Sequence, residues 1–300
     1  MTGLRYEYCP PFEGSRLDHV GTYKRTLPVN LDRMYENALD WEHLPYLHGS
    51  SFARITCLDA GAWGWCCRVV DSKERVRVLE LRLDRECRRW ITRNLEGPSQ
   101  GTEIWTHVFV TGPHQMDIVI DFFIPGVPQE AREKVGIAYA KSYESLYDED
   151  IWMMTERQKQ LDYRLDAVDV AEESEVDVTG DLPIKVSMSG RTFLIDRFED
   201  EWVIYPQTCP HQLGPMSGRV GEDGTITCPW HGYAFDVRSG ECSTGHHCRF
   251  GRRPNIVGQG SNKLLLCLHQ RVKLRNLNGV PTLLVFPKTE NIRHILRTRA

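Results

Sequence analysis

The sequence lacks any apolar run approaching the ~18–20 residues that a membrane-spanning helix needs. Its first residues, MTGLRYEYCPPFEG, lack the basic and then apolar regions of a secretory signal peptide. The net charge is only −4, so no excess of positive charge favours nucleic acid or an anionic membrane as a partner. We therefore expect a cytoplasmic protein that neither enters a membrane nor binds nucleic acid.

Motifs for a dinucleotide or for a plant-type all-cysteine iron–sulfur cluster are also missing. The sequence has no G-x-G-x-x-G fingerprint and no C-x₄-C-x₂-C run. Its ten cysteines are scattered irregularly, which argues against a disulfide framework in a chain without a secretion signal. Metal ligation is therefore the more attractive use for some of these cysteines.

The residues that are present give the first half of the chain a mixed character. Hydrophobic residues make up 41% of the sequence, which is enough for substantial cores. Residues 33–48 and 128–165 have apolar positions at helical spacing, whereas residues 51–124 alternate or run apolar between turn signals. We predict an α+β domain over residues 1–165, with a helix near each end.

The second half has a different composition. The acidic stretch DAVDVAEESEVDVTGD, residues 166–181, is the best candidate for a linker. Beyond it, short strand-like runs alternate with glycine-containing turns, which is typical of a small all-β domain. We place this domain at residues 182–290 and a tail at residues 291–300.

Two pairs of cysteine and histidine stand out in the second half. Cys209-x-His211 is followed, after sixteen residues, by Cys228-x-x-His231. A structural zinc site usually has C-x₂-C pairs or a finger with a helix, whereas each pair here mixes one cysteine and one histidine in a Pro/Gly-rich loop. The mixed set suits a [2Fe–2S] cluster, with two thiolates on one iron and two imidazoles on the other.

These residues resemble the Rieske iron–sulfur domain, and the resemblance covers the C-terminal third of the chain, including HGYAFDVRSGEC. It implies a Rieske-type [2Fe–2S] cluster bound by the two cysteines and two histidines. The respiratory-complex branch of that family adds a cysteine to each loop. The corresponding positions here carry Leu213-Gly214-Pro215 and Pro229-Trp230, which points to the oxygenase or ferredoxin branch.

A second candidate metal site lies in YENALDWEHLPYLHG, residues 35–49. His43 and His48 are five residues apart, so on an unbroken helix their side chains would point ~140° apart. Pro45 lies between them, and a proline inside a helix removes a hydrogen bond and clashes with the preceding turn. We expect the helix to kink or end at Pro45, so that both imidazoles face one point.

With a Rieske-like module on the same chain, ENALDWEHLPYLH closely resembles the N-x-x-D-x-x-H-x₄-H segment of the Rieske non-haem iron oxygenases. The resemblance implies a mononuclear Fe(II) bound by His43, His48 and a carboxylate from the long helix. In YDEDIWMMTERQKQ we expect this ligand to be Asp150, with Asp148 and Glu149 as close competitors.

Asp40 and Asn37 match the remaining positions of that motif. By resemblance, Asp40 is the carboxylate that bridges a Rieske histidine and an iron-ligand histidine and carries the electron path between the metal centres. We expect His231 to be its Rieske-side partner and His43 its iron-side partner. Asn37 would lie near the iron.

The resemblance implies a terminal oxygenase that receives electrons from a separate NAD(P)H-dependent reductase, directly or through a ferredoxin. It would activate O₂ and hydroxylate, demethylate or N-oxygenate a small organic substrate. Monooxygenation is favoured over dioxygenation, because no sign of a partner small subunit can be read from the sequence. The alternative is a non-catalytic electron-transfer protein, in which a Rieske carrier is fused to a ligand-binding domain.

The order of the domains departs from that of familiar members, which place the Rieske domain first. Those members assemble head to tail as homotrimers, in which the cluster of one subunit serves the iron of its neighbour. We expect a homotrimer here as well. The short catalytic domain suggests a compact helix-grip (Bet v1/START-like) fold, followed by the all-β Rieske domain.

Overall fold

The computed structural model describes residues 18–166 and 170–269. They belong to two compact units. The first comprises the chain up to Leu165 together with Thr208–Arg249, and the second comprises Asp166–Gln207 and the chain from Phe250 onward. The predicted tail, residues 291–300, lies outside the described residues, as does the C-terminal part of the predicted second domain.

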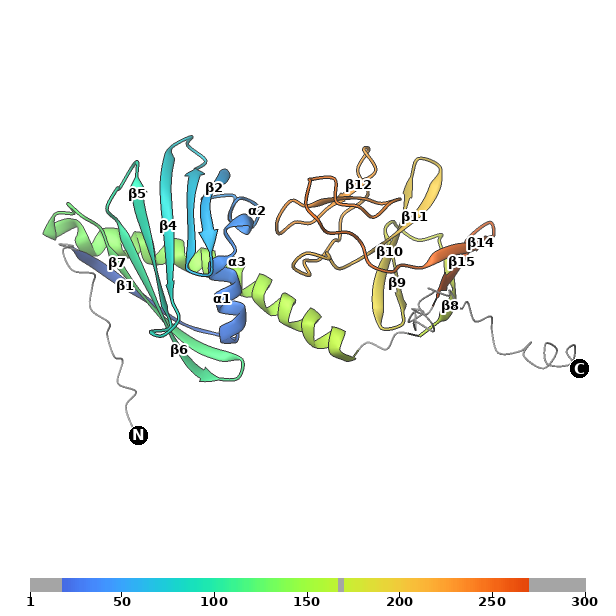
Figure 1. Cartoon of the computed structure of the whole chain (residues 1–300), viewed down its shortest axis with the longest axis horizontal. Coiled ribbons are helices and arrows are strands. Elements are labelled where there is room, and N and C mark those ends of the chain that lie inside the picture. The colour runs from blue at the N-terminus through green and yellow to red at the C-terminus, as the bar shows by residue number, and fades with distance from the viewer. Residues whose placement is uncertain (1–17, 167–169, 270–300) are drawn as a thin grey trace, which may run out of the picture. The chain divides into compact units, whose positions relative to one another are not determined.

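A seven-stranded antiparallel sheet forms the larger part of the first unit (Figure 1). Its spatial order is β1-β7-β6-β5-β4-β3-β2, so the first strand pairs with the last. The strands are β1 (His19–Leu27), β2 (Arg54–Gly61), β3 (Gly64–Val70), β4 (Val76–Asp84), β5 (Arg89–Glu96), β6 (Glu103–Gly112) and β7 (Gln115–Phe123).

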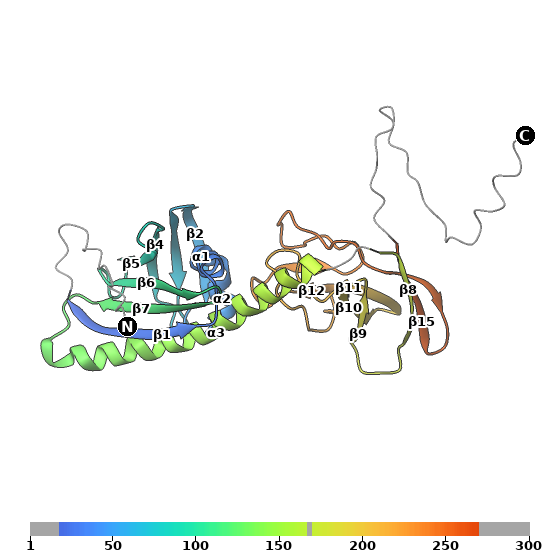
Figure 2. The same ribbon diagram turned by 90° about the horizontal axis from the view of Figure 1, so that it is seen from below.

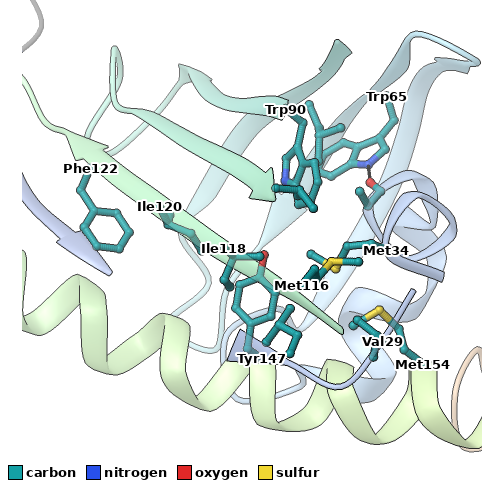
Figure 3. Packing of buried hydrophobic residues seen from close by; sticks show 14 of the residues in the cluster. Val29, Met34, Trp65, Trp90, Met116, Ile118, Ile120, Phe122, Tyr147 and Met154 are labelled. Carbon is teal, nitrogen blue, oxygen red and sulfur yellow. Dashed lines mark hydrogen bonds between the residues drawn. The ribbon is translucent and has the colours of Figure 1, made fainter. Parts of the chain in front are cut away.

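The long helix α3 (Arg132–Asp166), which follows a 3₁₀ turn η2 (Gln129–Ala131), runs along one face of this sheet (Figure 2). It approaches β1 so closely that a Cβ at Gly136 would lie 2.2 Å from the carbonyl oxygen of Val20. Tyr147 and Met154 of α3 meet apolar side chains of the sheet in a shared core (Figure 3). Among the described residues, no helix combines the length and apolar character needed to cross a membrane.

This arrangement of strands and helices is a helix grip. Two short helices follow the first strand, the long helix follows the last, and the sheet curves around that helix. The α+β class that the sequence predicts is therefore confirmed.

The helix predicted over residues 33–48 breaks earlier than expected. It comprises α1 (Leu31–Leu39), a 3₁₀ turn η1 (Trp41–His43) and a one-turn helix α2 (Leu44–Leu47). Asp40, with φ −87° and ψ 81°, is the C-cap of α1. Pro45 lies in the first turn of α2, where its missing N–H costs no intrahelical hydrogen bond. The prediction of a break at Pro45 is therefore wrong, because α1 already ends before Asp40.

The second unit contains two three-stranded antiparallel sheets that share a core. One sheet comprises β9 (Ile184–Met188), β10 (Arg191–Phe198) and β11 (Glu201–Pro206), and the other β8 (Glu172–Asp177), β14 (Asn255–Gln259) and β15 (Lys263–Leu268). Strand β8 lies inside the segment 166–181 that was expected to be a linker. It is ordered as a strand because it pairs with β15 and packs Val176 against the core, despite its acidic composition.

Candidate metal centres

His43 and His48 lie at the two ends of the one-turn helix α2. His43 is its N-cap and His48 its C-cap. Their ring centroids are 5.2 Å apart, and the ring planes are inclined at 71°. Both side chains are almost completely buried, at 3% and 2% exposure. The five-residue spacing therefore spans one helical turn with its caps and brings the two imidazoles together.

Asp150 of α3 meets both histidines. Its Oδ1 lies 3.1 Å from Nε2 of His48 and 3.6 Å from Nε2 of His43. One ligand atom from each of these buried residues can be chosen so that all three lie within 4.8 Å of one another. Two imidazoles and one carboxylate arranged in this way fit the 2-His-1-carboxylate set that binds Fe(II).

The two competing carboxylates make different contacts. Asp148, whose side chain is 61% exposed, forms an ion pair with Arg25 at 2.6 Å. Glu149 Oε2 lies 2.6 Å from Nδ1 of His48. With the Nδ1 proton donated to Glu149, Nε2 of His48 is left as the lone-pair nitrogen that can bind a metal. The only signal of this role in the sequence is that Glu149 directly precedes Asp150.

Asn37 contacts the candidate carboxylate ligand rather than the histidines. Its Nδ2 donates a hydrogen bond to Oδ1 of Asp150 at 2.8 Å. Burial raises the pKa of Asp150, but hydrogen bonding to His43 and His48 outweighs it and holds this pKa well below its ordinary value. Burial lowers the pKa of His43, but hydrogen bonding to Asp150 and Asp40 outweighs this effect and raises the pKa to about 10. A divalent cation would compete with that proton for the site.

Two loops with the same backbone pattern carry the cysteine–histidine pairs. In each loop the cysteine N–H donates to the carbonyl five residues on, and the N–H four residues on donates to the cysteine carbonyl. The residue at that fourth position, Leu213 or Gly232, has a φ of 68° or 67°. The second loop connects β12 (Thr225–Thr227) to β13 (Ala234–Asp236). Within this repeated turn the histidine lies two residues after Cys209 in the first loop and three residues after Cys228 in the second.

The four side chains form a buried donor set. Cys209 and Cys228 are fully buried, and the ring centroids of His211 and His231 are 4.7 Å apart. Among the described residues, the buried Nδ1 atoms of both histidines have no hydrogen-bond partner. Burial and the neighbouring His231 lower the pKa of His211 to about 4, which favours the neutral imidazole. A hydrogen bond with Cys209 lowers the pKa of Cys228 to about 5. The two buried thiols and the two unpartnered Nδ1 atoms fit a mixed Cys/His cluster.

Asp40 connects the two groups of candidate ligands. Its Oδ2 lies 2.7 Å from Nε2 of His231 and 3.6 Å from Nδ1 of His43. Burial raises the pKa of Asp40, but hydrogen bonding to these two histidines holds it well below its ordinary value. The structure thus brings together the three residues that the sequence analysis linked.

Tyr233 and Glu42 form a second connection, which the sequence analysis missed. The Tyr233 hydroxyl donates to Oε2 of Glu42 at 2.7 Å. The Tyr233 ring also stacks on His211, with centroids 4.3 Å apart, and on His246, with centroids 3.7 Å apart. Nothing local distinguishes these two residues beyond their positions beside His231 and His43, because the contact joins distant parts of the chain.

Comparison with known proteins identifies one part of the chain. Residues 166–250 match the model of the Rieske [2Fe–2S] domain, and this range contains both cysteine–histidine pairs. The match implies a [2Fe–2S] cluster. The homology to oxygenases covers only this domain.

The curated relatives match over short stretches. Flavonoid 8-hydroxylase 2, chloroplastic, from Ocimum basilicum is 45% identical over 42 residues, which are 14% of this chain and 8% of that protein. Pheophorbide a oxygenase, chloroplastic, from Oryza sativa subsp. japonica is 37% identical over 70 residues, which are 22% of this chain and 13% of that protein. These matches therefore span 8% and 13% of the relatives' own lengths. Among solved structures, a START superfamily protein from Mycobacterium smegmatis has a TM-score of 0.39 at 13% identity, covering 46% of this chain and 98% of that chain.

Proposed function

We propose that this chain is the terminal oxygenase component of a multicomponent Rieske system. It would receive electrons from a separate NAD(P)H-dependent reductase, directly or through a ferredoxin, and hydroxylate, demethylate or N-oxygenate a small organic substrate. The proposed ligands of the [2Fe–2S] cluster are Cys209, His211, Cys228 and His231, and those of a mononuclear Fe(II) are His43, His48 and Asp150.

When bound, the cluster would supply single electrons and the ferrous centre would supply open positions for O₂. The chain's own residues hold the ligands in place. Glu149 fixes the Nδ1 side of His48, and Asn37 orients Asp150. The buried Tyr147 and Met154 flank Asp150 along α3 and belong to the apolar core, which excludes water from this side of the site (Figure 3).

The observation that carries the proposal is the position of Asp40. A buried carboxylate is costly unless it is well partnered, and Asp40 is partnered by histidines from both candidate centres. The hydrogen bond to His231 at 2.7 Å and the electrostatic contact with His43 at 3.6 Å place Asp40 directly between the two sites. A zinc-stabilised module or a simple ligand-binding domain has no use for such a connection.

The test combines metal analysis with an oxidation assay. The purified protein is reconstituted anaerobically and supplied with a surrogate reductase, NADPH and isotopically labelled O₂. Because the two relatives described above are named for a flavonoid and for pheophorbide a, the substrate panel includes both compound classes. We expect about three Fe per chain and labelled product. About two Fe per chain without product would favour the electron carrier, and a protein lacking the EPR signal of a reduced cluster would contradict the proposal.

A further inference from the structure

The cysteine–histidine loops and the candidate iron site belong to one compact unit of a single chain. Residues 208–249, which contain both loops, group with the chain up to Leu165, which contains His43, His48 and Asp150. In the family that the sequence resembles, these two kinds of site meet between neighbouring subunits. We propose that in this protein the two centres of each working pair are supplied by the same chain. This inference rests on the proposed function for its meaning, although its central test does not.

Two matched hydrogen bonds join the second loop to the turn that ends at His43. His231 Nε2 lies 2.7 Å from Asp40 Oδ2, and Tyr233 Oη lies 2.7 Å from Glu42 Oε2. The two loop residues are two positions apart, and so are the two acceptors. Two hydrogen bonds with the same spacing on both sides therefore align the second loop with the turn before His43, instead of one isolated pair.

The first loop is held by the helix that provides Asp150. Arg157 Nη1 donates to the carbonyl of Gln212 at 3.2 Å, and Thr208 Oγ1 donates to Oε1 of Gln160 at 3.3 Å. Gln160 lies ten residues beyond Asp150, or about 15 Å along α3. One continuous helix thus carries the candidate iron ligand and the residues that contact this loop.

The packing around these hydrogen bonds leaves little free space. A Cβ at Gly232 would lie 2.2 Å from Cε1 of Tyr46, so no other residue fits there without movement. Trp230 is fully buried and meets Trp152 of α3 edge to face, with centroids 5.7 Å apart.

Photo-crosslinking of the full chain tests the proposal without any enzymatic readout. Tyr46 is replaced by benzoylphenylalanine, the protein is irradiated, and the products are separated on a denaturing gel before peptide mass spectrometry. We expect a link to residues 228–233 in a species of single-chain size. The same replacement at the exposed Ile137 serves as the control and should give no link to this loop.

If the link to residues 228–233 occurs only in a covalent dimer, the two centres come from different chains and the proposal is overturned. Benzoylphenylalanine at Trp152 provides a second position in case the first replacement disturbs folding. A properly folded protein that gives no link to the second loop from either position would also overturn the proposal.

A complementation experiment adds a functional readout. His43→Ala and His211→Ala chains are co-expressed with different tags, and assemblies that carry both tags are isolated. We expect turnover no higher than that of the two variants prepared separately, because each chain lacks one half of its own pair. Recovery of turnover in the mixed assemblies would show pairing between chains. If the wild-type chain has no oxygenase activity, the proposed function fails, whereas the crosslink still decides how the centres pair.

Discussion

Asp40 Oδ2 lies 2.7 Å from Nε2 of His231, although the two residues are 191 positions apart in the chain. His231 belongs to a candidate cluster loop, and Asp40 lies three residues before the candidate iron ligand His43. The carboxylate, whose side chain is 12% exposed, lies between two histidines. Hydrogen bonding to them outweighs the opposing effect of burial and holds its pKa low, so it carries its negative charge at neutral pH. It is therefore suited to connect the two centres, through a hydrogen bond to His231 and an electrostatic contact with His43 at 3.6 Å.

Replacing this carboxylate should slow electron transfer without removing either metal. Asp40→Asn keeps the side-chain shape but removes a charge-assisted hydrogen bond worth ~1.5–3 kcal/mol. If this loss falls fully on the barrier, it corresponds to about ten- to hundredfold slower transfer. The measurement is stopped-flow absorbance of the reduced cluster during reoxidation. Asp32→Asn, at an exposed position in the first turn of α1, is the matched control. Near-normal rates in Asp40→Asn would exclude the proposed connection.

Removing either histidine beside α2 should remove only the mononuclear metal. His43→Ala and His48→Ala each delete one of two buried imidazoles and leave the cysteine–histidine loops untouched. We expect the iron content to fall from about three to about two per chain, with an unchanged cluster spectrum and no product. His114→Ala, at an exposed position between β6 and β7, should keep all its iron. Full iron content in both α2 variants would mean that the mononuclear site lies elsewhere.

Substitution of two neighbouring carboxylates on α3, Asp150 and Asp148, should have very different effects on the iron content. Asp150→Ala removes the buried group that faces both histidines, so we expect loss of the mononuclear iron. Asp148→Ala removes a mostly exposed ion pair with Arg25, so we expect normal iron content and a stability change below about 1 kcal/mol. Metal analysis and thermal unfolding of both variants check this prediction. The reverse pattern of iron loss would assign the ligand to Asp148.

Metal-free protein should lose stability as the pH rises from neutral to alkaline. Despite opposing burial, hydrogen bonding to Asp150 and Asp40 raises the pKa of His43 to about 10, and hydrogen bonding to Asp40 raises that of His231 to about 9. Because both values exceed the unfolded value near 6.5, the stabilisation is fully present below about pH 6.5 and is lost as the pH rises through 9 to 10.

Urea unfolding of the metal-free protein at pH 6.5 and at pH 10 measures this loss of stability. In the control variant Asp40→Asn, the difference in unfolding free energy between the two pH values should be smaller. The affinity for a divalent metal should change in the opposite direction to the stability of the metal-free protein. It should increase as the pH rises, because the metal replaces the proton on His43. Calorimetry in buffers of different ionisation enthalpy should detect that proton release. Metal binding without release of protons would contradict the assignment of His43 as a ligand.

The sequence predicted those features that local patterns encode. The long helix has apolar positions at helical spacing and no internal proline, and the spacing of Cys209, His211, Cys228 and His231 is itself a motif. The sequence pointed to Pro45 as the helix breaker, whereas α1 already ends at Leu39 and Pro45 lies in the first turn of α2. Strand β8 was missed because its order comes from pairing with β15, about 90 residues further along the chain.

The contacts between the candidate centres also depend on tertiary structure rather than on local sequence patterns. Glu42 has no special neighbours in the sequence, and its hydrogen bond to Tyr233 depends on tertiary structure. Family resemblance suggested that Asp40 would pair with His231, but neither composition nor periodicity could have identified this pair. Local chemistry thus indicated the candidate metal-binding residues, whereas the partners that orient them could be identified only from the fold.

The first cysteine–histidine loop is crowded at Gly214, so a side chain added there should disturb the candidate cluster. A Cβ at Gly214 would lie 2.8 Å from Cδ2 of Trp230 and 3.0 Å from Sγ of Cys228, so Gly214→Ala must displace a buried ring or a candidate cluster thiol. Overpacking of this kind costs ~1–3 kcal/mol, and any movement of the thiol is felt directly by the cluster. We expect reduced cluster content by visible absorbance and EPR, with the mononuclear metal retained. Gly218→Ala is the matched control, because its Cβ would make an ordinary contact of 3.8 Å with Ile226. Equal cluster content in the two variants would contradict this prediction. It would show that the loop accommodates a side chain at Gly214 without displacing the thiol of Cys228.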